Sequence, residues 1–374
     1  MRPSWVEVDL DAIEFNTRQV AHHIAPAELC AVVKADAYGH GDVPVALAAI
    51  AGGASSLAVA LVEEGVRLRE ADVDVPILVL SEPSEEDLPS VVKHGLTPTV
   101  YRLGFVGLLA EAASMATTVP YPVHLKLDTG MHRVGAAPIE AFEVARAVDR
   151  DDRLALQGVF THFSVADEDV EYTRRQNTAL VRFVEALAGE GIEPRIVHAA
   201  NTAAALDLPE THHDMCRVGL GLYGLRPRPG SGEAVVLRPA MRVVSHVRYV
   251  RRVPSGARPS YGRIKEVDGP STIVTVPIGY ADGVRRKLAV PGSVLINAKR
   301  YDFAGQITMD MVVVDVGSDR VAVGDEVVLL GVQGDQQISA EEWADMLGTI
   351  NYEVVCDFGP RMPRRYTRGG RLHA

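Results

Sequence analysis

The sequence predicts an α/β protein with an N-terminal (β/α)8 barrel and a second, mainly β C-terminal domain. Eight short apolar runs alternate with segments of helical period between residues 29 and 224, and the pattern changes abruptly after residue 224. A doubly wound sheet is the main competitor for the first part. The length of 374 residues also requires more than one ordinary domain.

The eight predicted strands are rich in apolar, β-branched residues, and amphipathic segments separate them. In the last of these segments the apolar residues are spaced by three and four, which indicates one buried helix face. These residues are Leu180, Phe183, Val184 and Leu187. The predicted strands span residues 29–34, 57–60, 76–80, 97–101, 122–127, 154–162, 195–199 and 215–223. The predicted helices span residues 44–50, 63–71, 84–94, 104–116, 139–148 and 171–189.

A segment rich in proline and glycine, residues 225–233, follows the last predicted strand and cannot continue a helix. We therefore expect a barrel domain in residues 1–230 and a second domain in residues 231–374. In the second part only residues 339–347 show a helical pattern, which begins with a capping box of Ser339 and Glu342. The β-rich runs there span residues 241–250, 271–278, 293–296, 303–308, 311–316 and 326–330.

The charge balance excludes several classes of partner. The chain has 38 Lys and Arg residues against 49 Asp and Glu residues, and the net charge of −11 disfavours nucleic acids and anionic membranes. A local basic pocket for a small anion remains compatible with this balance. There is no membrane-spanning apolar stretch and no secretory signal at the N-terminus, so we expect a cytoplasmic location. Three isolated cysteines and adjacent histidine pairs give no reason to expect a metal site.

A lysine, Lys34, ends the first predicted strand. In a barrel this position lies at the carboxyl rim, where catalytic groups collect. An arbitrary lysine is a surface residue with a buried stem, but the apolar strand before Lys34 would hold its amine in surroundings of low dielectric. Such surroundings lower the pKa of an amine and favour a Schiff base with an aldehyde, so we predict that Lys34 is reactive.

The eighth predicted strand contains Gly219, Gly221 and Gly224 in a GxGxxG spacing. A dinucleotide site would require a helix to begin here, and the prolines that follow exclude one. Barrels instead bind phosphate at the loops after the seventh and eighth strands, and here the seventh is followed by Asn201 and Thr202, whose hydroxyl can donate to phosphate. A reactive lysine and a phosphate site together predict pyridoxal 5'-phosphate as the cofactor.

Nine motifs, spread over both predicted domains, make this prediction specific. They are AVVKADAYGHG (31–41), KLDTGMHRVG (126–135), THF (161–163), HAANTAA (198–204), RVGLGLYG (217–224), SYGR (260–263), GYADG (279–283), ITMDM (307–311) and INYE (350–353). With these motifs the chain resembles the alanine racemase family from residue 6 to residue 366. The resemblance implies a pyridoxal-phosphate enzyme that interconverts L- and D-alanine and supplies D-alanine for peptidoglycan.

The resemblance also assigns roles to single residues. It implies that Lys34 holds the cofactor as an aldimine and acts as one base, and that Tyr261 of the partner subunit acts as the other, in a homodimer with shared active sites. Racemisation needs two such groups because the proton leaves one face of a planar intermediate and returns on the other. Arg217 would face the pyridine nitrogen, and His162 would link Arg217 towards the tyrosine.

The remaining assignments concern cofactor, substrate and one modification. Thr202 stands where most members of the family have serine, which keeps the hydroxyl and adds a methyl group. The expected cofactor contacts are Tyr38, Asn201, Thr202, Gly219, Leu220 and Tyr352; the expected substrate contacts are Arg133 and Met309; Lys126 matches a lysine that is often carbamylated; and Tyr280 and Tyr352 would control substrate access.

The sequence leaves the substrate range open. Alanine and serine differ by one hydroxyl, which an apolar pocket rejects poorly, so a racemase of broader or serine specificity is one alternative. A non-catalytic barrel that stores pyridoxal phosphate is a second, although the second domain with Tyr261 counts against it. A barrel decarboxylase for basic amino acids is a third, and it would require side-chain recognition motifs that we do not find in the second domain.

Overall fold

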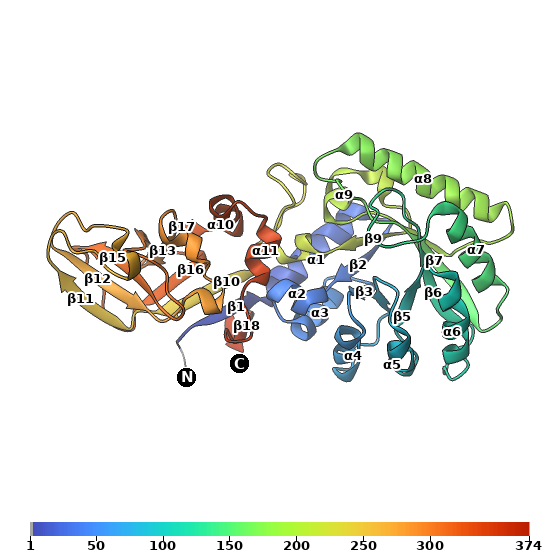
Figure 1. Cartoon of the computed structure of the whole chain (residues 1–374), viewed down its shortest axis with the longest axis horizontal. Helices are drawn as coiled ribbons and strands as arrows, with labels where there is room; N and C mark the ends of the chain where they lie inside the picture. Colours follow the sequence, from blue (N-terminus) through green and yellow to red (C-terminus); the bar gives the residue numbers. More distant parts are fainter. Residues whose placement is uncertain (1–2, 374) are drawn as a thin grey trace. The chain divides into compact units, whose positions relative to one another are not determined.

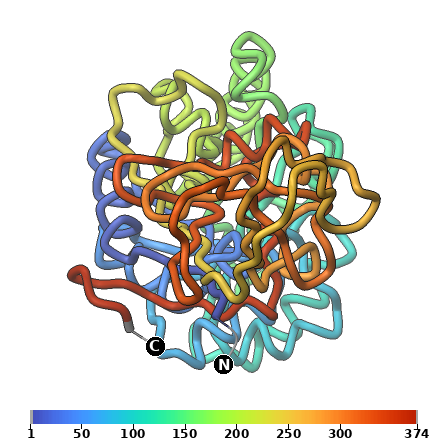
Figure 2. The backbone as a smooth tube through the Cα atoms, turned by 90° about the vertical axis from the view of Figure 1, so that its left-hand side faces the viewer, coloured from blue at the N-terminus to red at the C-terminus, as the bar shows by residue number. Residues whose placement is uncertain are grey.

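The computed structural model describes residues 3–373, and the chain forms two compact units, which can be followed from blue to red in Figures 1 and 2. The barrel unit comprises residues 12–37 and 42–238. The β unit comprises the described residues up to Asp11, the short segment Tyr38–Gly41 and the chain from Pro239 onward. The N-terminal strand therefore belongs to the β unit, whereas the sequence analysis placed all of residues 1–230 in the barrel domain.

The barrel unit contains the predicted (β/α)8 barrel. Its eight described strands are parallel and follow the order β8-β7-β6-β5-β4-β3-β2-β9. Hydrogen bonds from Asp214 N to Val197 O (3.1 Å) and from Arg217 N to Ala200 O (2.9 Å) join β9 to the β8 segment and close the ring, which excludes a doubly wound sheet. The strands are β2 (Glu28–Val32), β3 (Ser56–Val59), β4 (Ile77–Val79), β5 (Thr97–Val100), β6 (Tyr121–Lys126), β7 (Leu154–Phe160), β8 (Ile196–His198) and β9 (Met215–Val218).

Helices alternate with these strands and surround them in Figure 1. The longest, α8 (Val170–Ala188), buries Leu180, Phe183 and Leu187 of the predicted face. The fourth predicted residue, Val184, lies at the edge of this face and is only partly buried. Asp169 caps this helix because its side chain accepts a hydrogen bond from Tyr172 N (2.9 Å). The other helices before residue 238, apart from the turn α2, are α1 (Leu10–Ile24), α3 (Asp42–Ala51), α4 (Val62–Glu70), α5 (Leu88–Lys93), α6 (Leu103–Ala113), α7 (Pro138–Asp149) and α9 (Thr202–Asp207).

Three barrel strands end at least two residues earlier than the sequence predicts. β2 ends at Val32, β7 at Phe160 and β9 at Val218, so the polar residues that follow lie in loops. The largest difference is at β9, where Gly219 takes φ −114° and ψ −84° and leaves the extended region. A 3₁₀ helix, Leu220–Tyr223, then replaces the predicted strand residues, and the left-handed Gly224 (φ 78°) ends it.

The β unit is mainly β, as the sequence predicts. Its described strands form an eight-stranded sheet, in the order β14-β13-β16-β10-β1-β18-β19 with β17 paired to β16, and a three-stranded sheet, β11-β12-β15. The predicted run 241–250 is divided between the two sheets, and the run 303–308 contributes only an isolated bridge at Phe303. The strands are β1 (Trp5–Asp9), β10 (Met241–His246), β11 (Tyr249–Val253), β12 (Ser271–Val276), β13 (Ser293–Ile296), β14 (Lys299–Asp302), β15 (Val312–Gly317), β16 (Glu326–Gln333), β17 (Gln336–Ile338), β18 (Arg364–Arg368) and β19 (Arg371–His373).

Two helices complete the β unit. The first, α10 (Ala340–Leu347), begins at the predicted cap, since Ser339 Oγ accepts a hydrogen bond from Glu342 N (3.1 Å). The left-handed Gly348 (φ 72°) ends it, and α11 (Asn351–Cys356) follows directly.

Neither a membrane span nor a metal cluster occurs in the described part of the chain. Within residues 3–373, no helix is both long and apolar enough to cross a bilayer. No three His, Cys, Asp or Glu side chains in this range are grouped so that they could hold a metal ion. The cysteines are free thiols, with Cys30 and Cys216 buried and Cys356 exposed.

Candidate active site

Lys34 lies two residues beyond the end of β2, at the carboxyl end of the barrel strands. It begins a short left-handed turn, labelled α2 (Lys34–Gly39), in which the four residues from Ala35 to Tyr38 have φ between 50° and 54°. Each left-handed non-glycine residue costs about 1–2 kcal/mol, so four in succession require support from the surrounding structure. Strained backbone of this kind clusters at functional sites.

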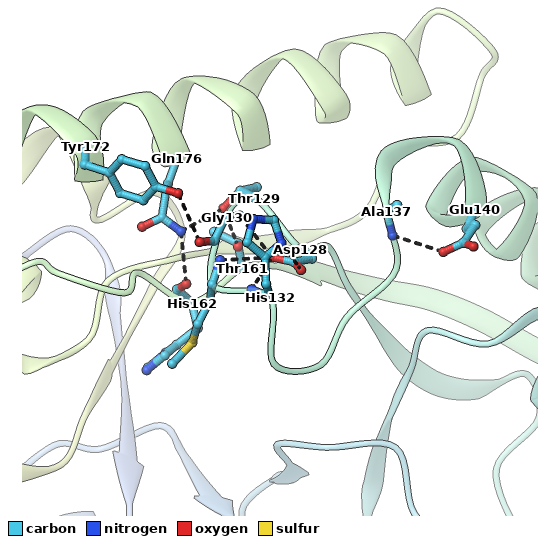
Figure 3. A network of polar contacts seen from close by, with 11 residues as sticks. Asp128, Thr129, Gly130, His132, Ala137, Glu140, Thr161, His162, Tyr172 and Gln176 are labelled. Carbon is cyan, nitrogen blue, oxygen red and sulfur yellow. Dashed lines mark hydrogen bonds and ion pairs between the residues drawn. The ribbon is translucent and has the colours of Figure 1, made fainter.

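Asp128 shapes the loop after β6, which carries Arg133 (Figure 3). Its Oδ1 atom accepts hydrogen bonds from the backbone N–H groups of Gly130 (2.9 Å), Met131 (3.0 Å) and His132 (3.1 Å). Its Oδ2 atom lies 3.1 Å from His132 Nδ1. The carboxylate therefore fixes the backbone on which Arg133 is mounted.

Helix α8 connects this loop to the loop after β7, as Figure 3 shows. Gln176 Nε2 donates to Thr129 Oγ1 and to His162 O, each at 3.4 Å. Tyr172 OH donates to Gly130 O at 3.0 Å. One helix thus positions the segments that carry Arg133 and His162.

Arg217 of β9 is a buried cation with 3% exposure. Its Nη2 atom donates to Thr161 O (2.8 Å), Ala199 O (3.0 Å) and His162 Nδ1 (3.2 Å), and its Nη1 atom donates to His198 Nδ1 (2.8 Å). Burial lowers the pKa of Arg217 to about 10, which still leaves it charged at neutral pH. Among the described residues, no carboxylate forms an ion pair with it.

The guanidinium determines how two histidines are protonated. Because a guanidinium can only donate, Nδ1 of His162 and Nδ1 of His198 must accept, and each ring carries its hydrogen on Nε2. Burial, and next the charge of Arg217, lowers the pKa of both histidines well below its ordinary value. The positive charge therefore lies on Arg217, and His162 is a neutral acceptor.

His198 continues this chain of neutral groups into the barrel. Its Nε2 atom donates to Nδ1 of His124 at 2.9 Å, and burial lowers the pKa of His124 to about 4. The ring of Phe160 stacks on His198 with 4.6 Å between centroids. Gly158 makes room for His124, because a Cβ atom at that position would lie 2.6 Å from the imidazole. The sequence analysis assigned no role to His124 or His198, which come from β6 and β8 and meet only in the folded barrel.

Lys126, the last residue of β6, is buried beside these groups. Its Nζ atom donates to Leu80 O (3.1 Å) and lies 5.3 Å from the ring centroid of Phe160. Burial, followed by the charges of Arg217, Arg133 and Lys34, lowers the pKa of Lys126 to about 7. Lys34, Arg133 and Arg217 thus make the carboxyl end of the barrel cationic around this amine.

Thr202 joins the loops after β8 and β9. Its Oγ1 atom accepts hydrogen bonds from Gly219 N (3.1 Å) and Gly221 N (3.5 Å). A Cβ atom at Gly221 would lie 3.2 Å from Thr202 Cγ2, so a glycine accommodates the methyl group that threonine adds. Asn201 caps α9, since its Oδ1 atom accepts from Ala204 N (3.1 Å), and Leu220 is buried at the start of the 3₁₀ helix.

The other expected site residues belong to the β unit. The rings of Tyr38 and Tyr352 lie 6.2 Å apart, and burial, with a smaller contribution from Tyr352, raises the pKa of Tyr38. Tyr261, Tyr280 and Met309 line one open cavity of about 950 Å³. Tyr261 is 72% exposed there.

The two units correspond to two known domains. The N-terminal domain of alanine racemases matches residues 8–227, and the C-terminal domain of alanine racemases matches residues 240–366. The chain belongs to the alanine racemase family. This family membership, the barrel and the separate β domain confirm what the nine motifs predicted.

Individual proteins are similar in sequence or structure to almost the whole of this chain. The alanine racemase of Carboxydothermus hydrogenoformans is 42% identical over 98% of this chain and 100% of its own length. The crystal structure of Bacillus anthracis alanine racemase with bound L-Ala-P superposes with a TM-score of 0.92, 35% identity and coverage of 100% and 97%. A histidine racemase from Leuconostoc mesenteroides has the same fold, with a TM-score of 0.90, 26% identity and 98% coverage of both chains.

We expect Gly158→Ala to lower the free energy of unfolding by about 1–3 kcal/mol, because the added methyl group would displace the His124 ring from His198. Urea denaturation followed by circular dichroism measures this loss. Gly107→Ala is the matched control: a Cβ atom there meets nothing within 4 Å, and alanine favours helix α6 by up to about 1 kcal/mol. Equal unfolding curves for the two variants would contradict the steric role of Gly158.

Proposed function

We propose that this chain interconverts L- and D-alanine with pyridoxal 5'-phosphate as cofactor and supplies D-alanine for peptidoglycan. The observation that carries the proposal is the cationic carboxyl end of the barrel in a member of the alanine racemase family. There Lys34 follows β2, Arg133 lies in the loop after β6 and Arg217 is the penultimate residue of β9. In a chain of net charge −11, such a cluster is suited to small anions such as a phosphate group and an amino-acid carboxylate. The cytoplasmic location is a further part of this proposal.

The donor set fits pyridoxal phosphate. The amine of Lys34 would bind its aldehyde group, and Arg217 would face its pyridine nitrogen. The phosphate would lie at the junction of Thr202 with Gly219 and Leu220, with the Tyr38 and Tyr352 hydroxyls as further donors and Asn201 holding the loop through its helix cap. When bound, the cofactor supplies an electron-accepting ring that stabilises the charge left on the substrate after its Cα proton is removed.

Two bases on opposite sides would move the Cα proton. We assign one side to Lys34 and the other to Tyr261, because each face of the substrate needs its own acid–base group. The proposed active form is a homodimer in which Tyr261 of the partner subunit completes the site. Its support is the exposure of Tyr261, 72%, since a tyrosine base requires surroundings from which water is excluded. Tyr280 and Tyr352 would control access to the site.

Arg217 and His162 would control where charge develops. The permanent charge of Arg217 disfavours protonation of a neighbouring pyridine nitrogen, which restrains side reactions. His162 accepts a hydrogen bond from Arg217 on Nδ1, so its Nε2–H is available to donate towards a tyrosine oxygen. Together they would favour the deprotonated form of Tyr261 without a charged histidine.

The substrate carboxylate would be bound by Arg133 and by the backbone N–H of Met309. The backbone of Met309 is fixed, since its carbonyl accepts a hydrogen bond from Ala281 N at 3.1 Å. The fold does not by itself determine which substrate side chain is accepted, because one protein of this fold is a histidine racemase. A racemase of broader or serine specificity is the alternative, and the histidine racemase supports only the point that this fold can serve another amino acid.

The two-base assignment predicts different losses of racemisation and of proton exchange in deuterium oxide. The wild type should form D-alanine from L-alanine and label both enantiomers at Cα. Tyr261→Phe should lower racemisation by about 10²–10⁴-fold, while Lys34 still exchanges the Cα proton of one enantiomer without inversion. Proton NMR and chiral chromatography measure the two processes.

Tyr249→Phe, at an exposed tyrosine of the same unit, serves as the control and should behave as the wild type. A wild-type protein that binds the cofactor but makes no D-alanine would contradict the proposed function. Normal racemisation by Tyr261→Phe would contradict the assignment of the tyrosine.

We also propose that Lys126 is carbamylated, since a buried uncharged amine can add carbon dioxide and the resulting anion would offset Arg133 and Arg217. The lowered pKa of about 7 means that the amine is mostly neutral at pH 8 and mostly protonated at pH 6. Protein equilibrated with ¹³C-bicarbonate should therefore show a carbamate signal in carbon NMR at pH 8 that weakens towards pH 6. The signal should vanish in Lys126→Met and persist in Lys93→Met, which changes an exposed lysine. A signal that survives in Lys126→Met would refute the assignment.

A further inference from the structure

A carboxylate outside all nine motifs reaches the turn that carries Lys34. Glu64 lies in the first turn of α4 and is buried, with 6% exposure. Its Oε1 atom accepts a hydrogen bond from Ala35 N at 2.7 Å, which is the first backbone N–H after Lys34. Its Oε2 atom accepts from Ala60 N (2.8 Å) and Leu61 N (3.1 Å), at the start of its own helix.

The two carboxylate oxygens therefore have different tasks. The Oε2 contacts are local, because they cap the helix to which Glu64 belongs. The Oε1 contact spans 29 residues of sequence and connects helix α4 to the left-handed turn after β2. Hydrogen bonds to an ionised carboxylate are stronger than those between neutral groups, and burial removes the competition of water.

A second set of hydrogen bonds connects the same helix to Asp42, which lies beyond the turn. Arg67 Nε and Nη2 donate to Asp42 Oδ2 at 3.0 and 2.8 Å. Asp42 N in turn donates to Asp36 Oδ1 at 3.1 Å. Helix α4 thus holds this segment at Ala35, the first of the strained residues, and at Asp42, beyond the last of them.

We propose that Glu64 is a positioning residue for Lys34: its carboxylate holds the left-handed turn by the Ala35 N–H and so fixes the direction of the lysine side chain. The inference rests on the proposed function only in the role that it gives to Lys34. Four left-handed non-glycine residues would otherwise relax, because nothing in their own conformational preference favours this turn. A relaxed turn would leave the amine displaced from the groups at the ends of β6 and β9.

The variant Glu64→Gln tests this inference. An amide has one accepting oxygen and one NH₂ group, so in either orientation it turns a donor towards Ala35 N or towards Ala60 and Leu61. Glu64→Asp is the second variant, because it keeps the charge that caps α4 but is one methylene too short to span both sites. Glu63→Gln is the matched control, at an exposed neighbour in the same helical turn.

Hydrogen–deuterium exchange of the full chain, read by mass spectrometry on peptides covering residues 33–41, is the deciding measurement. We expect exchange in this segment to be about 10- to 100-fold faster in Glu64→Gln and Glu64→Asp than in the wild type, and unchanged in Glu63→Gln. For the loaded enzyme we expect kcat for alanine to fall by about 10- to 100-fold while KM changes little, because the carboxylate contacts are on other segments.

Two outcomes would overturn the inference. One is faster exchange only within residues 62–70, which would make Glu64 a helix cap and no more. The other is unchanged exchange and unchanged kcat in Glu64→Asp. A wild-type protein without racemase activity would overturn the proposed function instead, and the exchange of residues 33–41 would still decide whether Glu64 holds the turn.

Discussion

A buried guanidinium without a carboxylate partner in the described chain is the constraint on which the barrel site depends. Arg217 is held by two carbonyl oxygens and two imidazole nitrogens, all neutral, so its charge is left uncompensated. A buried cation is costly unless all its donors are satisfied. This requirement explains why the loops after β7 and β8 converge on β9, and why His162 and His198 are neutral.

The same charge organises the groups around it. It contributes, after burial, to the low pKa of Lys126, and it lies 5.0 Å from the Phe160 ring that also faces that lysine. The cationic end of the barrel is therefore a site prepared for anions inside an acidic protein. A phosphate, a substrate carboxylate and a carbamate on Lys126 would each reduce the uncompensated charge, which connects cofactor binding, substrate binding and the proposed modification through one electrostatic cause.

Much of this could be predicted from the sequence. The strand–helix alternation specified the barrel. The prediction that a strand ends at Lys34 was wrong by only two residues, because an apolar run before a polar residue is a local signal. The ends of β7 and β9 were placed too late, since Gly219 leaves the extended region for reasons of loop geometry that alternation cannot show. The place of β1 depends on its pairing with β10 and β18, more than 200 residues away.

Long-range contacts also explain which polar residues were missed. His124 and His198 come from β6 and β8, the two neighbours of β7. Glu64 of α4 contacts Ala35 in the turn after β2. No spacing within a motif reveals either pair. The left-handed turn after Lys34 was equally hidden, because alanine and tyrosine do not favour positive φ. Tertiary hydrogen bonds decide these features.

Among the hydrogen-bonded groups Arg217, His162, His198 and His124, Arg217 alone carries a positive charge. Nitrogen-15 NMR of histidine-labelled protein tests this charge distribution most directly, because imidazolium and the two neutral tautomers give different signals. The variants His162→Gln and His198→Gln assign the resonances to the two histidines. We expect both histidines to be neutral and protonated on Nε2 at pH 7, because burial and the charge of Arg217 lower the pKa of each. An imidazolium signal from either histidine at pH 7 would contradict it.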